Sequence, residues 1–316
     1  MPADMKNSKT EFIPRFRKAF LLPRYWPTWG GLAIIGVFAA TPPSLRDPVL
    51  EKLGWLAGRL GKSARQRARI NLSLCFPEYS YKKREKIIDA MFATAPQAIV
   101  LMAELALFGA DKISHRVRWN GLDFIEAITH NNEKVIFLVP HAWGIDIPAM
   151  LMAASGRKVS AMFHNQKNPV VDYVWNIARR RFGGRLHARD DGIRSFVQSV
   201  RQGYWGYYLP DQDHGPAVSE FADFFATYKA TLPVTERLRR ISKAHIIPLF
   251  PIYDGKTHQL TINISSPLAV MNDCCDAQIA RQINEVIEKF VRPHPEQYTW
   301  ILKFLKTRKA GEDDPY

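Results

Sequence analysis

The chain has 316 residues, 47% of them hydrophobic, which is enough for one large domain or for a domain with an appendage. Its formal charge of +14 suits an anionic membrane surface, a phosphorylated or acidic ligand, or a nucleic acid. No zinc-finger spacing, RNP box or homeodomain-type helix occurs, so a nucleic acid ranks last. The three cysteines give neither a disulfide framework nor metal-ligand spacing, which indicates a reducing compartment.

The N-terminal part has the composition of a membrane anchor. Residues 1–24 are polar and basic, whereas residues 25–45 carry no charge and have aromatic side chains at one end, as at a membrane interface. Pro27 and Pro42 leave residues 28–41 for a helix of about 21 Å, against a hydrocarbon core of about 30 Å. Basic residues flank both ends, so charge does not decide the orientation. We expect membrane attachment, either by a spanning helix or by a wedge in one leaflet.

A helical, partly membrane-facing region is expected next, over residues 46–120. Within 49–76, leucines alternate with basic side chains, which indicates an amphipathic helix, either on anionic headgroups or packed on its own domain. Residues 90–108 contain one charge, Glu104, and a proline, Pro96, which together indicate a buried helix rather than a membrane span.

The remainder, residues 121–316, alternates between β-rich runs and helical patterns. Strands are expected at 135–139, 158–163, 185–189, 204–209, 245–252 and 259–264. Helices are expected at 121–131, 147–155, 170–182, 192–202, 229–243, 276–291 and 296–306. This order predicts an α/β domain with a mostly parallel central sheet and helices on both faces. The last two strands, joined by DGKT, indicate a hairpin, so the sheet should carry an antiparallel edge.

The stretch Lys134–Met150, KVIFLVPHAWGIDIPAM, places polar groups at the end of a buried strand. His141 follows this strand at its carboxyl end, where open α/β sheets bind their ligands. Helix positions i and i+5 lie about 140° apart, so His141 can meet Asp146 only across a turn, for which Gly144 supplies the freedom. In contact, the carboxylate would hold the imidazole as a general base. Alternatively, His141 caps the strand and Asp146 lies at a helix N-terminus.

A second polar group follows the expected strand at 204–209. Asp211, Gln212, Asp213 and His214 would again lie at a carboxyl end of the sheet. Their D-x-D-H order could ligate a divalent metal. The alternative is a polar loop whose aspartates accept bonds from backbone amides.

Five arginines lie between the two polar groups, near a Gly-Gly turn. Arginine suits bidentate recognition of phosphates and oxyanions, although a solvated helix face is the favoured interpretation for two of the five. They are Arg179, Arg180, Arg181, Arg185 and Arg189.

The motif HAWGID resembles the H-x4-D/E box of the glycerolipid acyltransferase superfamily. Three longer blocks resemble the late acyltransferases of lipid A biosynthesis, most closely the branch that adds the last, myristoyl, chain. These blocks are NNEKVIFLVPHAWGIDIPAM, MFHNQKNPVVDYVWNIARRRFGGRLHAR and LPDQDHGPAVSEFADFFATYKAT. The flanking stretches FIPRF, PRYW, TPPSLRDP and PEQYTWILKFLKTRK extend the resemblance over nearly the whole chain.

The resemblance implies a cofactor-independent acyltransferase of the bacterial inner membrane with its catalytic domain on the cytoplasmic side. It would move a myristoyl chain from acyl carrier protein to the 3-hydroxyl of an acyl chain on Kdo2-(lauroyl)-lipid IVA, giving Kdo2-lipid A. The expected base is His141, oriented by Asp146, with Arg179 at the oxyanion. By position in the family's motifs, Arg179, Arg189 and Asp211 are the expected substrate-binding residues.

Two other functions fit the same residues. A membrane-anchored metal-dependent hydrolase would use His141, Asp211, Asp213 and His214 as ligands, and it would need bound zinc or manganese. A non-catalytic, membrane-bound module for polyanions would use the basic charge alone.

Overall fold

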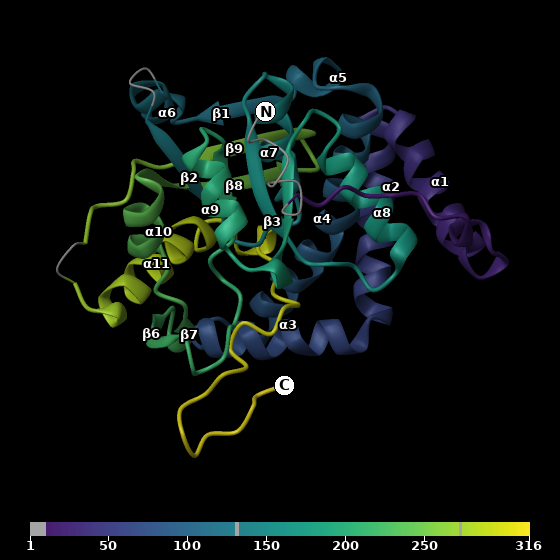
Figure 1. Ribbon diagram of the computed structural model, residues 1–316. Coiled ribbons are helices and arrows are strands. Elements are labelled where there is room, and N and C mark those ends of the chain that lie inside the picture. The colour runs from purple at the N-terminus through teal and green to yellow at the C-terminus, as the bar shows by residue number, and fades with distance from the viewer. Residues whose placement is uncertain (1–10, 130–132, 272–273) are drawn as a thin grey trace, which may run out of the picture.

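The computed structural model describes residues 11–129, 133–271 and 274–316, and its centre is a seven-stranded sheet (Figure 1). Five strands run parallel to their neighbours in the order β8-β2-β5-β3-β4, whereas β9 pairs antiparallel with β8 and β1 runs parallel to β9. The expected mostly parallel sheet with an antiparallel hairpin toward one edge is therefore confirmed. The strands are β1 (Val117–Asn120), β2 (Lys134–Leu138), β3 (Val159–Phe163), β4 (Arg185–Ala188), β5 (Trp205–Tyr208), β8 (Ala244–Asp254) and β9 (Gln259–Ile264).

Strand β2 lies in the middle of this sheet because both of its faces are apolar. Val135 and Phe137 enter one core, whereas Ile136 and Leu138 enter the core on the opposite face, and all four are fully buried. Alternate residues of a strand point to opposite faces, so a continuous apolar run is what burial on both sides requires.

Helices cover both faces, as expected. One face carries α6 (Leu122–Thr129), α7 (Asp146–Ala154) and α8 (Pro169–Arg179). The other carries α9 (Arg194–Arg201), α10 (Thr235–Ser242) and α11 (Asp276–Val291). The chain begins with α1 (Trp26–Ala40), α2 (Pro43–Leu60), α3 (Lys62–Cys75), α4 (Tyr81–Phe108) and the short α5 (Asp111–Ser114).

Helix α4 contains the expected buried segment 90–108. By length and composition it is the one helix in the described part of the chain that could cross a membrane, yet 56% of its apolar window is buried inside the protein. Leu101 and Leu105, for example, are fully buried against the sheet. This helix therefore packs as a core helix, with Pro96 accommodated inside it.

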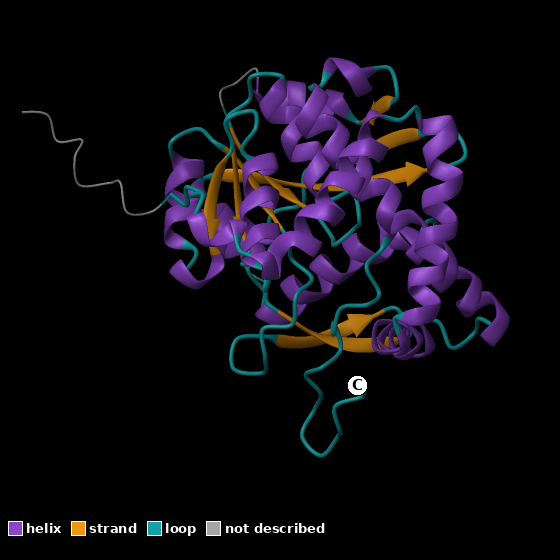
Figure 2. Cartoon of the chain, turned by 90° about the vertical axis from the view of Figure 1, so that its right-hand side faces the viewer, coloured by secondary structure: helices purple, strands orange, loops and turns teal. Residues whose placement is uncertain are grey.

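Several expected boundaries are wrong. The amphipathic segment 49–76 is two helices, α2 and α3, because the chain breaks at Gly61. The helix expected over 229–243 starts only at Thr235, since its first residues belong to β7 (Thr227–Thr231). That strand pairs antiparallel with β6 (Glu220–Phe224) in a small separate sheet, seen at the lower edge of Figure 2, that packs on α11.

The helix expected over 296–306 does not form. Only a single 3-10 turn, Pro295–Gln297, precedes an irregular segment in which Tyr298 and Trp300 are fully buried. Their burial and the pairing of Tyr298 with Ala142 hold this segment extended beside the end of β2, so tertiary packing overrides the helical pattern.

The crossing of α2 over α4 yields a prediction about stability. A Cβ atom on Gly54 would lie 2.2 Å from the backbone oxygen of Phe92 in α4, so Gly54→Ala must push the helices apart. We expect the free energy of unfolding to fall by about 1–3 kcal/mol, measured by chemical denaturation. Gly31→Ala in α1 is the control, because no atom lies within 4 Å of its Cβ position. Equal stabilities of the two variants would contradict this crossing.

Candidate active site

The register between β2 and β5 brings two polar side chains to the same edge of the sheet. Leu138 pairs with Tyr208 across these neighbouring parallel strands. His141 and Asp211 each follow three residues later, so both emerge at the carboxyl ends. This is the edge at which α/β sheets bind their ligands.

Asp211 is the carboxylate that holds His141. Its Oδ1 lies 2.5 Å from the imidazole Nδ1, and its Oδ2 accepts a bond of 2.8 Å from the backbone amide of His141. Asp211 is fully buried, and burial alone would raise the pKa of its carboxyl. The charge of His141 and its hydrogen bonds outweigh burial and hold this pKa below its ordinary value. With Nδ1 donating to the carboxylate, the ring's Nε2 faces the pocket as the proton acceptor.

Asp146 has different partners, which corrects the expectation that it orients His141. At the first turn of α7, its Oδ1 accepts from Nε of Arg179 at 2.9 Å. Its Oδ2 accepts from Arg179 Nη2 at 3.1 Å and from the indole of Trp175 at 2.9 Å. Helix α8 supplies both donors and satisfies both carboxylate oxygens. Asp146 thus positions an arginine, although it lines the same pocket as His141.

Arg189 lies next to His214, with Nη2 3.0 Å from the imidazole Nδ1. Burial lowers the pKa of His214 to about 4, and the nearby charges of Arg189 and Lys229 act in the same direction. His214 is therefore neutral at pH 7 and accepts the bond from Arg189. This arrangement leaves the rest of the Arg189 guanidinium toward the pocket, which it lines.

The four ligands of the metal-dependent hydrolase do not converge. Asp213 binds Thr307, with its two oxygens 2.7 Å from the backbone amide and the hydroxyl of that residue. Asp211 binds His141, and His214 binds Arg189. Among the residues that the structure describes, no three His, Cys, Asp or Glu side chains gather as a metal site would require. The geometry therefore does not favour this alternative.

Two further residues belong to the site and were missed from sequence. Thr299 donates to the carbonyl of His141 from its backbone amide at 3.1 Å and from its hydroxyl at 2.8 Å. Lys229 is fully buried on β7, and burial lowers its pKa to about 8 although Asp211 and Asp213 oppose the shift. Thr299 falls in the stretch PEQYTWILKFLKTRK, but no spacing rule connects either residue with His141.

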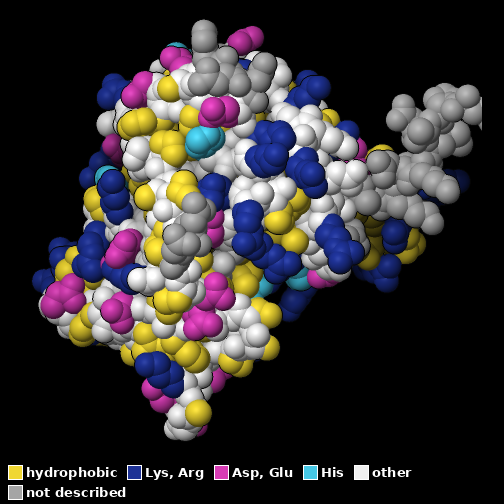
Figure 3. All heavy atoms as spheres, turned by 60° about the vertical axis from the view of Figure 1, so that its left-hand side comes forward, with side chains coloured by type: hydrophobic (Ala, Val, Ile, Leu, Met, Phe, Trp, Pro, Cys, Tyr) yellow, Lys and Arg dark blue, Asp and Glu magenta, His cyan; other side chains and the backbone are white. Residues whose placement is uncertain are grey.

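The polar groups open into a pocket of about 630 Å³, within the usual range for ligand sites. Helix α7 and strand β3 supply an apolar wall of small and medium side chains, namely Ala149, Met150, Ala153, Val159 and Ala161. Three of the five arginines singled out in the sequence line the pocket: Arg179, Arg185 and Arg189. In Figure 3, Lys and Arg side chains gather across the middle of one face of the protein, with apolar side chains between them.

Such a site can remove a proton from a hydroxyl while an apolar chain lies in the pocket beside it. A His–Asp pair at the carboxyl edge of a mostly parallel sheet, with the HAWGID motif at the end of its strand, agrees with the acyltransferases of the H-x4-D type. Residues 13–307 match the family of bacterial lipid A biosynthesis acyltransferases. The chain belongs to this family, within its late-acting branch.

Relatives of the chain align with it over almost their full lengths. It is 64% identical over 313 residues to the lipid A biosynthesis myristoyltransferase of Escherichia coli K12, which covers 99% of this chain and 97% of that protein. It is 42% identical to a lipid A biosynthesis acyltransferase of Haemophilus influenzae, covering 97% and 96% of the two chains. Identity to the lipid A biosynthesis lauroyltransferase of Escherichia coli K12 is 29%, covering 96% and 99%.

The lowered pKa of His214 predicts a dependence of stability on pH. In the unfolded chain His214 binds a proton near pH 6.5, whereas in the folded protein it does so only near pH 4. The unfolded state therefore binds more protons between these values, and the free energy of unfolding should fall as pH is lowered from about 6.5 to 4. The control is His214→Gln, in which this part of the loss should disappear in denaturation curves at pH 7 and pH 5. Identical losses in both proteins would contradict it.

Proposed function

We propose that this enzyme transfers a myristoyl group from acyl carrier protein to the 3-hydroxyl of an acyl chain on Kdo2-(lauroyl)-lipid IVA, the last acylation that forms Kdo2-lipid A. The observation that carries the proposal is the His141–Asp211 pair beside a pocket with an apolar wall. The similarity to the lipid A biosynthesis myristoyltransferase of Escherichia coli K12 supports the class of acceptor and the length of the transferred acyl chain.

In the proposed reaction His141 is the general base. Its Nε2 takes the proton from the acceptor hydroxyl as the oxygen attacks the thioester carbonyl, while Asp211 fixes the tautomer and stabilises the imidazolium. Collapse of the tetrahedral intermediate breaks the C–S bond, and the imidazolium returns the proton to the departing thiolate. The ester bond thus forms without an acyl-enzyme, which agrees with the absence of a G-x-S-x-G motif.

Arg179 is proposed to stabilise the oxyanion. Asp146 binds its Nε and Nη2, so the guanidinium is held in one orientation before the substrate arrives. Preorganised positive charge is what a developing oxyanion requires, because no reorganisation is then needed during the reaction. On this view Asp146 serves catalysis through Arg179.

The arginines that line the pocket, Arg179, Arg185 and Arg189, suit the anionic groups of the substrates. We assign Arg189, which follows the carboxyl end of β4 and lines the pocket, to phosphate or Kdo carboxylate groups of the lipid A precursor. The acidic acyl carrier protein would dock on the same positively charged side of the protein. The lipid acceptor supports a location at the bacterial inner membrane, and the proposed donor supports a catalytic domain that faces the cytoplasm.

The role of the His141–Asp211 pair is testable by a double-mutant cycle. His141→Ala and Asp211→Asn should each lower kcat by about 10²-fold or more, since each removes the oriented base. Because the two residues act as one unit, the double variant should be no slower than the slower single variant. Acyl transfer is followed by mass spectrometry of the lipid product.

Asp213→Asn is the matched control from the same loop. Asp213 binds Thr307 rather than His141, so its variant should unfold more easily yet keep kcat within a few-fold of the wild type. If Asp211→Asn turned over as fast as Asp213→Asn, the assignment of Asp211 would be wrong.

Docking of acyl carrier protein predicts a dependence on ionic strength. Raising salt from about 0.1 M to 1 M shortens the Debye length from about 10 Å to 3 Å, which weakens attraction between exposed charges. The KM for acyl carrier protein should therefore rise steeply, whereas kcat at saturating donor should change little. A constant KM over this range would contradict electrostatic docking.

A further inference from the structure

The first two helices expose large apolar side chains on one flank of the protein. We call these eight residues the outer apolar face, and each is between 45% and 73% exposed. They are Trp26, Ile34 and Val37 of α1 and Leu45, Val49, Leu53, Leu56 and Leu60 of α2. Exposed apolar area of this extent marks a surface that another apolar phase or partner covers.

The members on α2 form one continuous stripe. Their spacings of four, four, three and four residues place them on the same side of the helix. The opposite side of α2 is buried on α4, where Gly54 and Gly58 allow close approach. Ala39 and Leu50 join α1 and α2 to the same helix in a small core. The outer apolar face is therefore distinct from the packing surface.

Both ends of α1 are attached to the globular body. At its start, Thr28 accepts a bond of 2.9 Å from Asn168, the N-cap residue of α8. The segment that precedes α1 packs on α8 through Phe20 and Tyr173, and further back the amide of Phe12 donates to Leu186 in β4 at 2.9 Å. The beginning of α1 thus lies against α8 and the β4 edge of the sheet.

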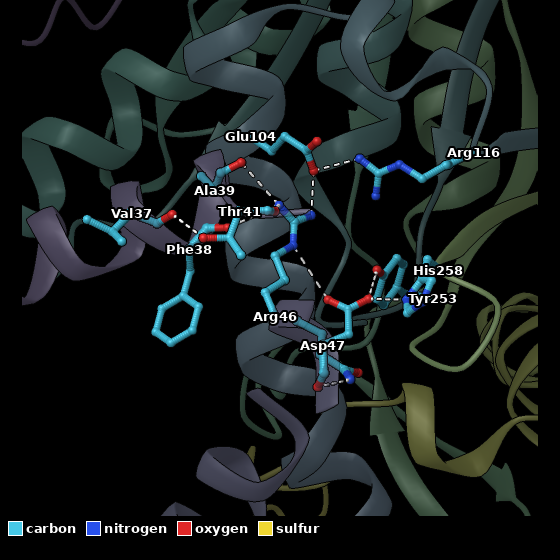
Figure 4. Close-up of polar contacts among 11 residues, drawn as sticks. Val37, Phe38, Ala39, Thr41, Arg46, Asp47, Glu104, Arg116, Tyr253 and His258 are labelled. Atoms are coloured by element: carbon cyan, nitrogen blue, oxygen red, sulfur yellow. Dashed lines mark hydrogen bonds and ion pairs between the residues drawn. The ribbon is translucent and has the colours of Figure 1, made fainter. Parts of the chain in front are cut away.

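At the end of α1, a buried arginine binds the last turn (Figure 4). Nη1 of Arg46 lies 3.1–3.2 Å from the carbonyl oxygens of Phe38, Ala39 and Thr41. Arg46 also binds Glu104 of α4, which in turn binds Arg116 at 2.6 Å.

Asp47, next in the chain, continues this network toward the sheet. Its Oδ2 accepts from the hydroxyl of Tyr253 at 2.5 Å and lies 2.7 Å from Nδ1 of His258, both on or just after β8. Arg46, Asp47 and Glu104 are almost completely buried. Breaking this network would leave buried charges without partners, which is strongly destabilising. The network therefore fixes the end of α1 to the protein.

A helix that crosses a bilayer has its two ends on opposite sides of about 30 Å of hydrocarbon. Helix α1 has 15 residues, about 22 Å, and both of its ends are bound to one folded body. If α1 spanned the bilayer, α8, α4 and the edges of the sheet would have to enter the hydrocarbon with it. These elements carry polar side chains at the two ends of α1, Asn168 at its start and Glu104 at its end.

We propose that α1 and α2 lie in the plane of the membrane, with the outer apolar face inserted into one leaflet of an anionic phospholipid bilayer, and that neither helix crosses it. This inference rests on the proposed function only in placing the protein at a membrane. Exposed basic residues in the segment before α1, on α2 and at the start of α3 match anionic headgroups. They are Arg15, Arg17, Lys18, Arg24, Lys52, Arg59 and Lys62.

The test measures the depth of spin labels in vesicles of phosphatidylcholine and phosphatidylglycerol. In a Cys274→Ser, Cys275→Ser background, single cysteines replace Trp26, Ala33 and Ala40 along α1 and Leu53 on α2. Cys75 is buried and stays. All four labels should lie at one shallow depth, about 5–10 Å below the headgroups. Lys256→Cys, in the exposed β8–β9 turn, is the aqueous control.

A label at position 33 near the bilayer centre, about 15 Å deep, with shallow labels at 26 and 40, would show a spanning helix and overturn the proposal. Labels that all remain in water would overturn it as well. On neutral phosphatidylcholine vesicles partitioning should be about tenfold weaker or more, since basic residues near an anionic surface add to binding; equal partitioning would refute the choice of an anionic surface. Acyl transfer by the same variants separates the two proposals, because it tests the proposed function whatever the labels report.

Discussion

The carboxylate of Asp211 is the group on which the site depends. A fully buried carboxylate costs several kcal/mol in lost hydration unless its oxygens are well bonded. Here both oxygens bind His141, one through the ring and one through the backbone amide. That geometry exists only while Leu138 stays paired with Tyr208 and Thr299 holds the carbonyl of His141. The register of the sheet and the C-terminal segment therefore both affect the position of His141 relative to the buried carboxylate of Asp211.

Much of the fold could be predicted because its signals are local. All six strands expected from apolar runs form, since burial on both faces requires such runs whatever the order of the strands. The helix expected at 296–306 fails for a tertiary reason, because the same residues gain more by burying Trp300 and pairing with Ala142. Three strands were missed. β6 and β7 pair only with each other and pack on α11, and β1 falls at the end of the region 46–120 that was expected to be helical.

In the candidate site, too, local features could be predicted from the sequence whereas tertiary contacts could not. The sequence located His141 at a strand end correctly, and it named Asp211 and Arg179 through resemblance. It assigned the wrong partner to the imidazole because spacing along the chain suggested Asp146, five residues away, whereas Asp211 arrives from 70 residues away through strand pairing. Lys229 lies within the third block of the resemblance, but its complete burial could not be predicted, because the residues around a lysine in the sequence do not show whether it is buried.

The net charge of +14 is divided between structure and surface. Buried Arg46 of α2 and Arg65 of α3 are paired with carboxylates of α4, and Arg179 is held by Asp146. Arg46 and Arg65 organise the protein and contribute little electric field outside it, whereas Arg179 lines the pocket. Other basic residues remain accessible, among them Arg185 and Arg189 at the pocket and Lys52, Arg59 and Lys62 beside the outer apolar face. A phosphorylated lipid fits basic residues that lie next to apolar surface. Its headgroup stays at the level of the basic residues, while its acyl chains need an apolar phase.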